Sequence, residues 1–82
     1  MIEVTLELGL QLVQRDNIKL ISDGLSDDEY IFYKKGSGIC YEDGALIGRN
    51  WRYAFNFLDR MDWTRRSRFY IVGKEWLLCI MY

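Results

Sequence analysis

Residues 30–44 read YIFYKKGSGICYEDG, and this stretch decides the fold. Two runs rich in aromatic and β-branched residues, Tyr30–Lys35 and Gly38–Glu42, flank a short glycine-serine link, which is typical of a β-hairpin. Asp43-Gly44 follows directly and favours a turn, because glycine adopts a positive φ without steric cost. A further apolar run, Ile18–Ser22, precedes these two and predicts another strand. We therefore predict an antiparallel sheet of consecutive strands.

The segment before these strands fits two patterns. Apolar residues alternate from Val4 to Leu12 as in a strand, whereas Leu6, Leu10 and Val13 also form a helical stripe. We predict a helix over Thr5–Arg15, because threonine is a good N-cap, an arginine lies in the last turn and Asp-Asn follows as a stop. A strand is the alternative.

After the hairpin the pattern becomes helical again. Trp51, Ala54, Phe55 and Leu58 recur at helical spacing behind Asn50, a residue suited to cap the first turn. These features predict a second helix over residues 51–60.

Two more strands are predicted at the end of the chain, Phe69–Val72 and Glu75–Tyr82, with Gly73-Lys74 as a hairpin turn. The last strand is apolar on both faces, so a second copy of the chain or a partner is expected to cover one of them, unless it lies between the two helices. The predicted order is αβββαββ, an α+β fold with a small, mainly antiparallel sheet. With 82 residues we expect one domain, residues 1–82.

Charge is distributed unevenly along the chain. Up to Ala45 there are four basic and nine acidic residues, a net charge of −5, whereas from Leu46 onward the net charge is +4. This asymmetry favours two faces with different partners or head-to-tail self-association; a mixed solvated surface is the alternative. No apolar run approaches the roughly 18 residues that cross a bilayer, and the N-terminus does not resemble a secretory signal, so we expect a cytoplasmic protein without membrane contact.

The composition excludes several kinds of chemistry. There is no histidine, which removes the commonest general base and zinc ligand, so we expect no catalytic residues and no enzyme. Cys40 and Cys79 lie in apolar segments and are expected to be reduced, buried thiols rather than metal ligands. No phosphate-binding glycine loop is present, and we expect no cofactor.

Arginines and aromatic residues alternate in the second half of the chain. Arginine binds phosphate through two parallel hydrogen bonds and aromatic rings stack on bases, so this pattern predicts a nucleotide or single-stranded nucleic acid as ligand. A basic loop beside core aromatics is the alternative. The candidate ligand-binding residues are Arg52, Tyr53, Arg60, Trp63, Arg65 and Arg66.

A second candidate surface is acidic. Its carboxylates do not have the spacing of a calcium-binding EF-hand loop, so we expect no metal site. Such a surface can instead bind a basic protein by imitating the phosphates of a nucleic acid. The candidate partner-binding residues are Asp23, Asp27, Asp28 and Glu29.

The layout of residues 5–63 resembles the anti-Thoeris family of small phage counter-defence proteins. The matching pieces are Leu6, Gly9, Leu10 and Val13, then Glu29-Tyr30-Ile31-Phe32-Tyr33, a glycine hairpin, Glu42-Asp43-Gly44 and Asp62-Trp63. The resemblance implies the sequestration of cyclic ADP-ribose-type signals in pockets formed by assembled subunits. This chain departs from the family pattern at residues 17–22, where no arginine-tryptophan pair follows the first helix, and in its hairpin over residues 69–82. Anti-CRISPR proteins share its size and mixed architecture.

Together these features predict a non-enzymatic, phage-type inhibitor of host antiviral defence that acts in the host cytoplasm by sequestering a nucleotide signal. It could form a homo-oligomer through its C-terminal hairpin. An anti-CRISPR-like inhibitor that binds a host defence protein through the acidic surface is the first alternative. A small nucleic-acid-binding regulator is the second.

Overall fold

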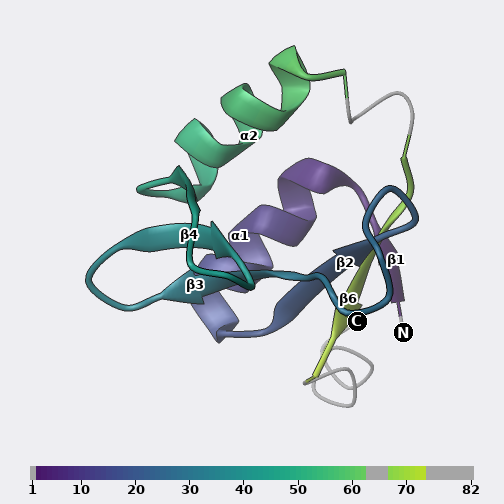
Figure 1. The fold of residues 1–82 in the computed structure, drawn as a ribbon, viewed down its shortest axis with the longest axis horizontal. Helices are drawn as coiled ribbons and strands as arrows, with labels where there is room; N and C mark the ends of the chain where they lie inside the picture. Colours follow the sequence, from purple (N-terminus) through teal and green to yellow (C-terminus); the bar gives the residue numbers. More distant parts are fainter. Residues whose placement is uncertain (1, 63–66, 74–82) are drawn as a thin grey trace.

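The computed structural model describes residues 2–62 and 67–73, which form two helices and a six-stranded antiparallel sheet (Figure 1). The α+β class predicted from the sequence is confirmed. The strands lie in the order β1-β6-β2-β3-β4-β5. Along the chain the elements are β1 (Ile2–Val4), α1 (Leu6–Asp16), β2 (Lys19–Ser22), β3 (Ile31–Lys34), β4 (Gly38–Tyr41), β5 (Leu46–Gly48), α2 (Trp51–Arg60) and β6 (Phe69–Val72).

Helix α1 settles the ambiguity of the N-terminal segment in favour of a helix. The Thr5 hydroxyl accepts a hydrogen bond from the Leu8 N–H at 3.2 Å, so the predicted N-cap is confirmed. Asn17 has a left-handed φ of 56° and donates its N–H to the Val13 carbonyl, which ends the helix. The apolar stripe of α1 is buried because this face of the helix packs on the sheet. The alternating apolar residues that suggested a strand form one only at β1, which ends at Val4.

Two short strands, β1 and β5, were not predicted. Each has three residues, too few for an alternating pattern, and β1 exists through a partner far along the chain, since Val4 pairs with Phe69. Strand β6 lies between β1 and β2, so both of its edges are occupied. The predicted strand Glu75–Tyr82, and with it the predicted C-terminal hairpin, lies outside the described part of the chain.

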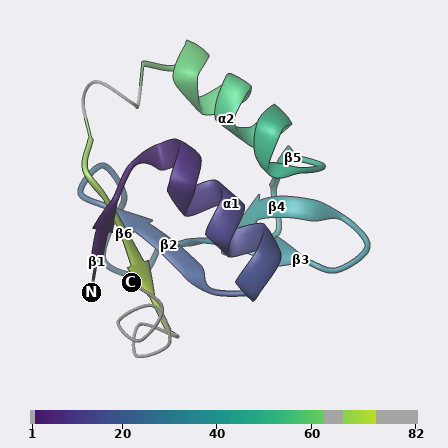
Figure 2. The same ribbon diagram turned by 180° about the vertical axis from the view of Figure 1, so that it is seen from behind.

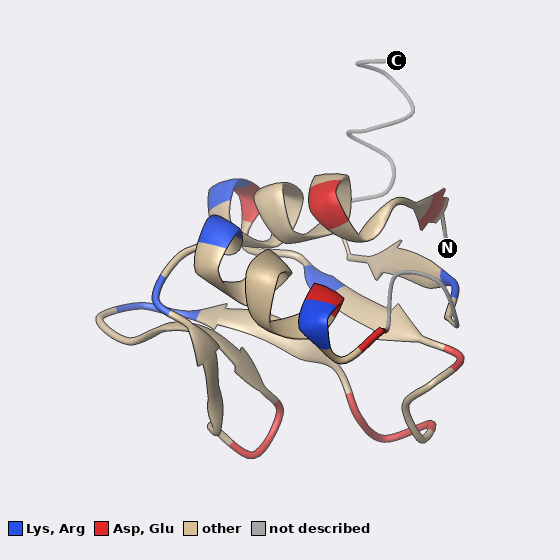
Figure 3. Cartoon of the chain, turned by 90° about the horizontal axis from the view of Figure 1, so that it is seen from above, with Lys and Arg blue, Asp and Glu red and all other residues tan. Residues whose placement is uncertain are grey.

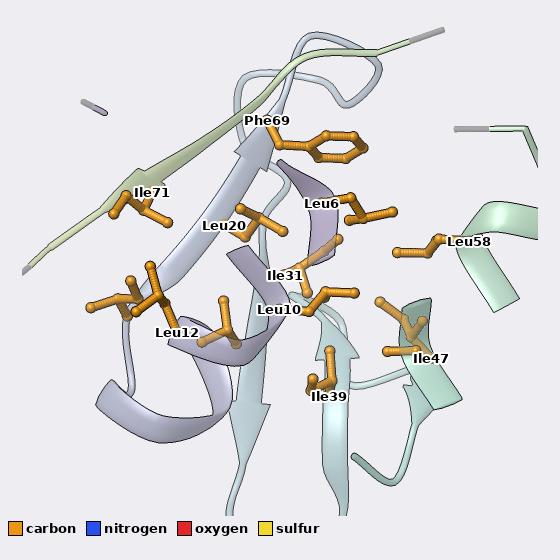
Figure 4. Close-up of a cluster of buried hydrophobic side chains, with 13 residues drawn as sticks. Leu6, Leu10, Leu12, Leu20, Ile31, Ile39, Ile47, Leu58, Phe69 and Ile71 are labelled. Atoms are coloured by element: carbon orange, nitrogen blue, oxygen red, sulfur yellow. The ribbon is translucent and has the colours of Figure 1, made fainter. Parts of the chain in front are cut away.

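Helix α1 lies over one face of the sheet, and α2 lies alongside α1 near β5 (Figure 2). Helix α1 packs across the middle strands, whereas α2 packs against α1 and β5. Between them and the sheet lies a core of aliphatic side chains with one phenylalanine (Figure 4). The members of this core are Leu6, Leu10, Leu12, Val13, Ile18, Leu20, Ile31, Ile39, Ile47, Ala54, Leu58, Phe69 and Ile71.

The other face of the sheet has no helix over it in the described residues (Figure 3). Side chains alternate between the faces of a sheet. Because Leu20, Ile31 and Ile71 face the helices, their neighbours in the strands face away. We call this side the open sheet face, and its residues include Lys19, Ile21, Phe32, Tyr70 and Val72. Cys40 pairs with Phe32 and is fully buried, as expected for a structural thiol, and Cys79 lies outside the described residues.

Candidate functional site

An open hollow of about 420 Å³ lies at the start of α2. Its volume is within the roughly 300–1,000 Å³ of pockets that hold small molecules. Two arginines, one tyrosine and two asparagines line it, and we call it the arginine–tyrosine surface. Its residues are Arg49, Asn50, Arg52, Tyr53 and Asn56.

The backbone at this surface is held by three local contacts. Gly48 lies so close to Ala54 that a side chain at residue 48 would meet the helix backbone, with the Ala54 Cα at 2.8 Å. The Asn50 side-chain oxygen accepts the N–H groups of Arg52 and Tyr53 at 3.0 and 3.1 Å. Gln14 of α1 accepts the Trp51 N–H at 2.7 Å. The first amides of α2 are therefore already bonded, and a ligand would be held by side chains rather than by the helix N-terminus.

The guanidinium groups rest on aromatic rings. Arg49 lies 4.5 Å from the centre of the Tyr53 ring and donates to the Tyr53 hydroxyl at 2.7 Å. Arg52 lies 5.3 Å from the centre of the Trp51 ring. Within residues 2–62 and 67–73, neither arginine forms an ion pair with a carboxylate. Their positive charge is thus available to an anion, and Tyr53 is 50% exposed.

The structure brings together only part of the predicted site. Arg52 and Tyr53 line the hollow. Arg60 lies near the other end of α2, where its Nε donates to the Asn56 carbonyl at 3.3 Å, and it does not line the hollow. The remaining predicted residues, Trp63, Arg65 and Arg66, lie outside the described part of the chain.

Arg49 is the residue that the sequence reading missed. It precedes the Asn50 cap, so it belongs to no helical pattern, but it stands four residues before Tyr53. The sequence signal was the run Arg49-Asn50-Trp51-Arg52-Tyr53, in which the cap turns the first arginine back onto the helix. Trp51 is half-buried and packs against the core, as its place on the apolar stripe predicted.

The predicted acidic residues lie in the loop between β2 and β3, away from the helices (Figure 3). Asp23 accepts the Arg68 N–H at 2.9 Å, so this carboxylate ties the loop to the chain before β6. Glu29 accepts hydrogen bonds from the Ser26 hydroxyl and N–H, and these bonds lower the pKa of Glu29. Asp27 and Asp28 are exposed. These two are the carboxylates of the loop best placed to meet a partner.

A second acidic loop contains Glu42 and Asp43, between β4 and β5. Burial raises the pKa of the Tyr41 hydroxyl, and the negative charges of Glu29 and Asp43 raise it further. Carboxylates of both loops therefore act on the same phenol. We call residues 23–29 and 42–43 the acidic loops.

A larger hollow of about 670 Å³ lies where β1 and the start of α1 meet Phe55 and the start of β6. Glu3 and Glu7 line it together with Arg68. Among the described residues that line it, two carboxylates stand against one guanidinium, whereas the described lining of the arginine–tyrosine surface has two guanidinium groups and no carboxylate, so the latter suits an anionic ligand better.

The described residues contain neither a cluster of metal-binding side chains nor a membrane-spanning helix. Among residues 2–62 and 67–73 no group of three or more metal-binding side chains lies together. In the same part of the chain no helix is long and apolar enough to cross a membrane.

Comparisons with known protein families, curated proteins and solved structures found no match for this chain. The resemblance to counter-defence proteins therefore remains a prediction from the sequence layout.

Proposed function

We propose that this chain is a non-catalytic binding protein that captures a nucleotide-type ligand at the arginine–tyrosine surface. The observation that supports this most is the pair Arg49 and Arg52, which lie on aromatic rings beside one hollow without a carboxylate partner in the described residues. Guanidinium groups bind phosphate through parallel hydrogen bonds, and the exposed Tyr53 ring offers a stacking surface for a base.

The proposed biological role is that of a phage-type inhibitor of host defence, in which capture removes a signalling nucleotide from solution. This role follows from the resemblance to the anti-Thoeris family, whose implied ligand, a cyclic ADP-ribose-type signal, has both phosphates and a base. The arginine–tyrosine surface has a matching group for each of these parts. No catalytic step is part of the proposal, because capture alone lowers the free concentration of the signal.

Isothermal titration calorimetry with ADP-ribose tests the proposal. Replacing both Arg49→Ala and Arg52→Ala removes two charge-assisted contacts of about 1.5 to 3 kcal/mol each, so affinity should fall about a hundredfold or more. The matched control is Arg15→Ala, which removes an arginine that pairs with Asp16 in the last turn of α1 and does not line the hollow. The control should bind as the unmodified protein does.

Tyr53→Ala should weaken ADP-ribose more than inorganic phosphate, because only ADP-ribose has a base to stack on the ring. Equal affinity of the unmodified protein and the double arginine variant would contradict the proposal. A retained nucleotide-sized mass in native mass spectrometry of the protein purified from cells would support it independently. Binding of single-stranded nucleic acid that weakens steeply with salt would instead favour the alternative function, that of a small nucleic-acid-binding regulator.

A further inference from the structure

The open sheet face carries apolar side chains where a solvated sheet is usually polar. An antiparallel sheet with helices on one side normally alternates apolar residues inward and polar residues outward. Here Ile21 pairs with Tyr70 across two strands, and Phe32 and Val72 lie on the same face. All four are only half-buried. An apolar face of this kind marks an interaction surface.

Aromatic rings dominate one part of this face. Tyr30 and Phe32 form an edge-to-face pair with ring centres 5.8 Å apart. The Lys19 ammonium lies 4.3 Å from the centre of the Tyr30 ring. Tyrosine and phenylalanine are enriched at protein interfaces, because they bury a large area and lose little conformational entropy.

Acidic loops border one end of the open sheet face, where β2 and β4 end, whereas Lys34 lies at the opposite end, next to the hairpin between β3 and β4. Both acidic loops project on this side of the sheet, away from the helices (Figure 3). A partner that crosses this end of the open sheet face meets apolar rings and then carboxylates, and its complementary charge at that end is positive.

We propose that the open sheet face docks a cationic protein segment with apolar side chains. The apolar side chains lie against Ile21, Phe32 and Tyr70, and lysines or arginines lie against the acidic loops. A second copy of this chain is the competing occupant, and the oligomeric state of the unmodified protein distinguishes it from a cationic segment. The proposal is independent of nucleotide capture, since the two surfaces have no residue in common.

Fluorescence anisotropy with a labelled short peptide of alternating lysine and leucine tests the proposal at about 0.15 M salt, where exposed charges more than roughly 8 Å apart are screened. Two matched peptides separate charge from apolar contact, one of alternating lysine and serine and one of alternating glutamate and leucine. The lysine-leucine peptide should bind at least about tenfold more tightly than either.

Two variants locate the contact. Phe32→Thr removes a ring from the open sheet face while keeping a good strand residue, and it should weaken the lysine-leucine peptide about tenfold. Asp27→Asn with Asp28→Asn should weaken it about threefold and reduce its salt dependence. These aspartates are exposed loop residues, so this variant remains informative if Phe32→Thr does not fold. The control Phe57→Ser alters a side chain on α2 that is 40% exposed and should change nothing.

Four results would overturn the proposal. The first is equal binding of the lysine-leucine and lysine-serine peptides, and the second is unchanged binding in both open-face variants. The third is a dimer of the unmodified protein that Phe32→Thr dissociates, which identifies a second copy as the occupant. The fourth is a nuclear Overhauser contact between Trp76 and Tyr70 without peptide, which identifies the chain's own C-terminal segment.

Discussion

The start of α2 and the open sheet face both expose aromatic rings, but opposite charges surround them. Arg49 and Arg52 lie beside Tyr53, whereas the acidic loops project on the side of Phe32 and Tyr70. The net charge of −1 conceals this separation. It survives folding because these two arginines lie after residue 45 and the acidic loops before it. A nearly neutral small protein can thus present two surfaces suited to chemically different partners.

The two surfaces also differ in how they are held. The open sheet face lies on strands that hydrogen-bond to neighbours on both sides, such as β6 between β1 and β2. The arginine–tyrosine surface depends on the close approach of Gly48 to α2 and on the caps of one helix end. Local changes should therefore disrupt the second surface without disrupting the first.

The largest expected effect comes from Gly48→Ala. The new methyl group would meet backbone atoms of Ala54 and Tyr53, which cannot move without shifting α2. We expect a loss of about 3 kcal/mol in the free energy of unfolding, measured by urea denaturation, together with loss of ADP-ribose binding. Gly36→Ala is the control, since its φ of 88° is strained for alanine but no atom lies within 4 Å. It should cost about 1 kcal/mol. Equal costs would show that α2 is not held by this approach.

A smaller effect is expected from Asn50→Asp. This substitution keeps a capping side chain at the start of α2 but adds a negative charge to the arginine–tyrosine surface. Aspartate caps a helix as well as asparagine does, so the free energy of unfolding should change by less than about 0.5 kcal/mol. The added carboxylate lies beside Arg49 and Arg52 and should lower ADP-ribose affinity about tenfold. Calorimetry and urea denaturation measure the two quantities. Unaltered affinity would place the ligand elsewhere.

The smallest effect concerns Tyr41. Its raised pKa means that folding favours the neutral phenol, so this contribution to stability is complete below pH 10 and is lost as pH rises through the pKa of the folded state. Asp43→Asn removes one of the charges that raise this pKa and should lower it, as followed by NMR titration of the Tyr41 ring. Asp28→Asn is the control, because Asp28 is not among the causes of the shift. An unchanged Tyr41 pKa in the Asp43→Asn variant would show that the loop of residues 42–43 does not act on the Tyr41 hydroxyl.

The sequence predicted the elements whose signals are local. The Thr5 and Asn50 caps, the glycine hairpin between β3 and β4 and the stripe of α2 depend on residues a few positions apart. The place of β6 could not be predicted, because its pairing with β1 joins residues almost 70 positions apart and leaves no periodic trace. The sequence indicated β6 as a strand, but its position between two strands from the start of the chain depends on these long-range pairings.

The candidate site follows the same rule. Arg52 and Tyr53 were predicted because aromatic and basic residues adjoin in the sequence, and Arg60 was included for the same reason. Helical geometry separates Arg60 from the hollow, since eight residues of helix span about 12 Å. It also returns Arg49 to Tyr53, one turn later. The composition of this segment indicated the kind of ligand. The Asn50 cap determines that Arg49, and not Arg60, joins Tyr53 at the hollow.

The position of β6 bears on how the chain folds during its synthesis on the ribosome. Strands β1 and β2 both pair with β6, so β1 lacks this partner, and β2 has only β3 beside it, until residues 69–72 have emerged. Until then α1 can pack only on the sheet formed by β2 to β5, and the apolar residues of β1 remain exposed to water. Completion of the sheet is therefore a late, long-range step of the kind that slows folding, and a nascent chain that stalls before Phe69 would be a natural client for a chaperone.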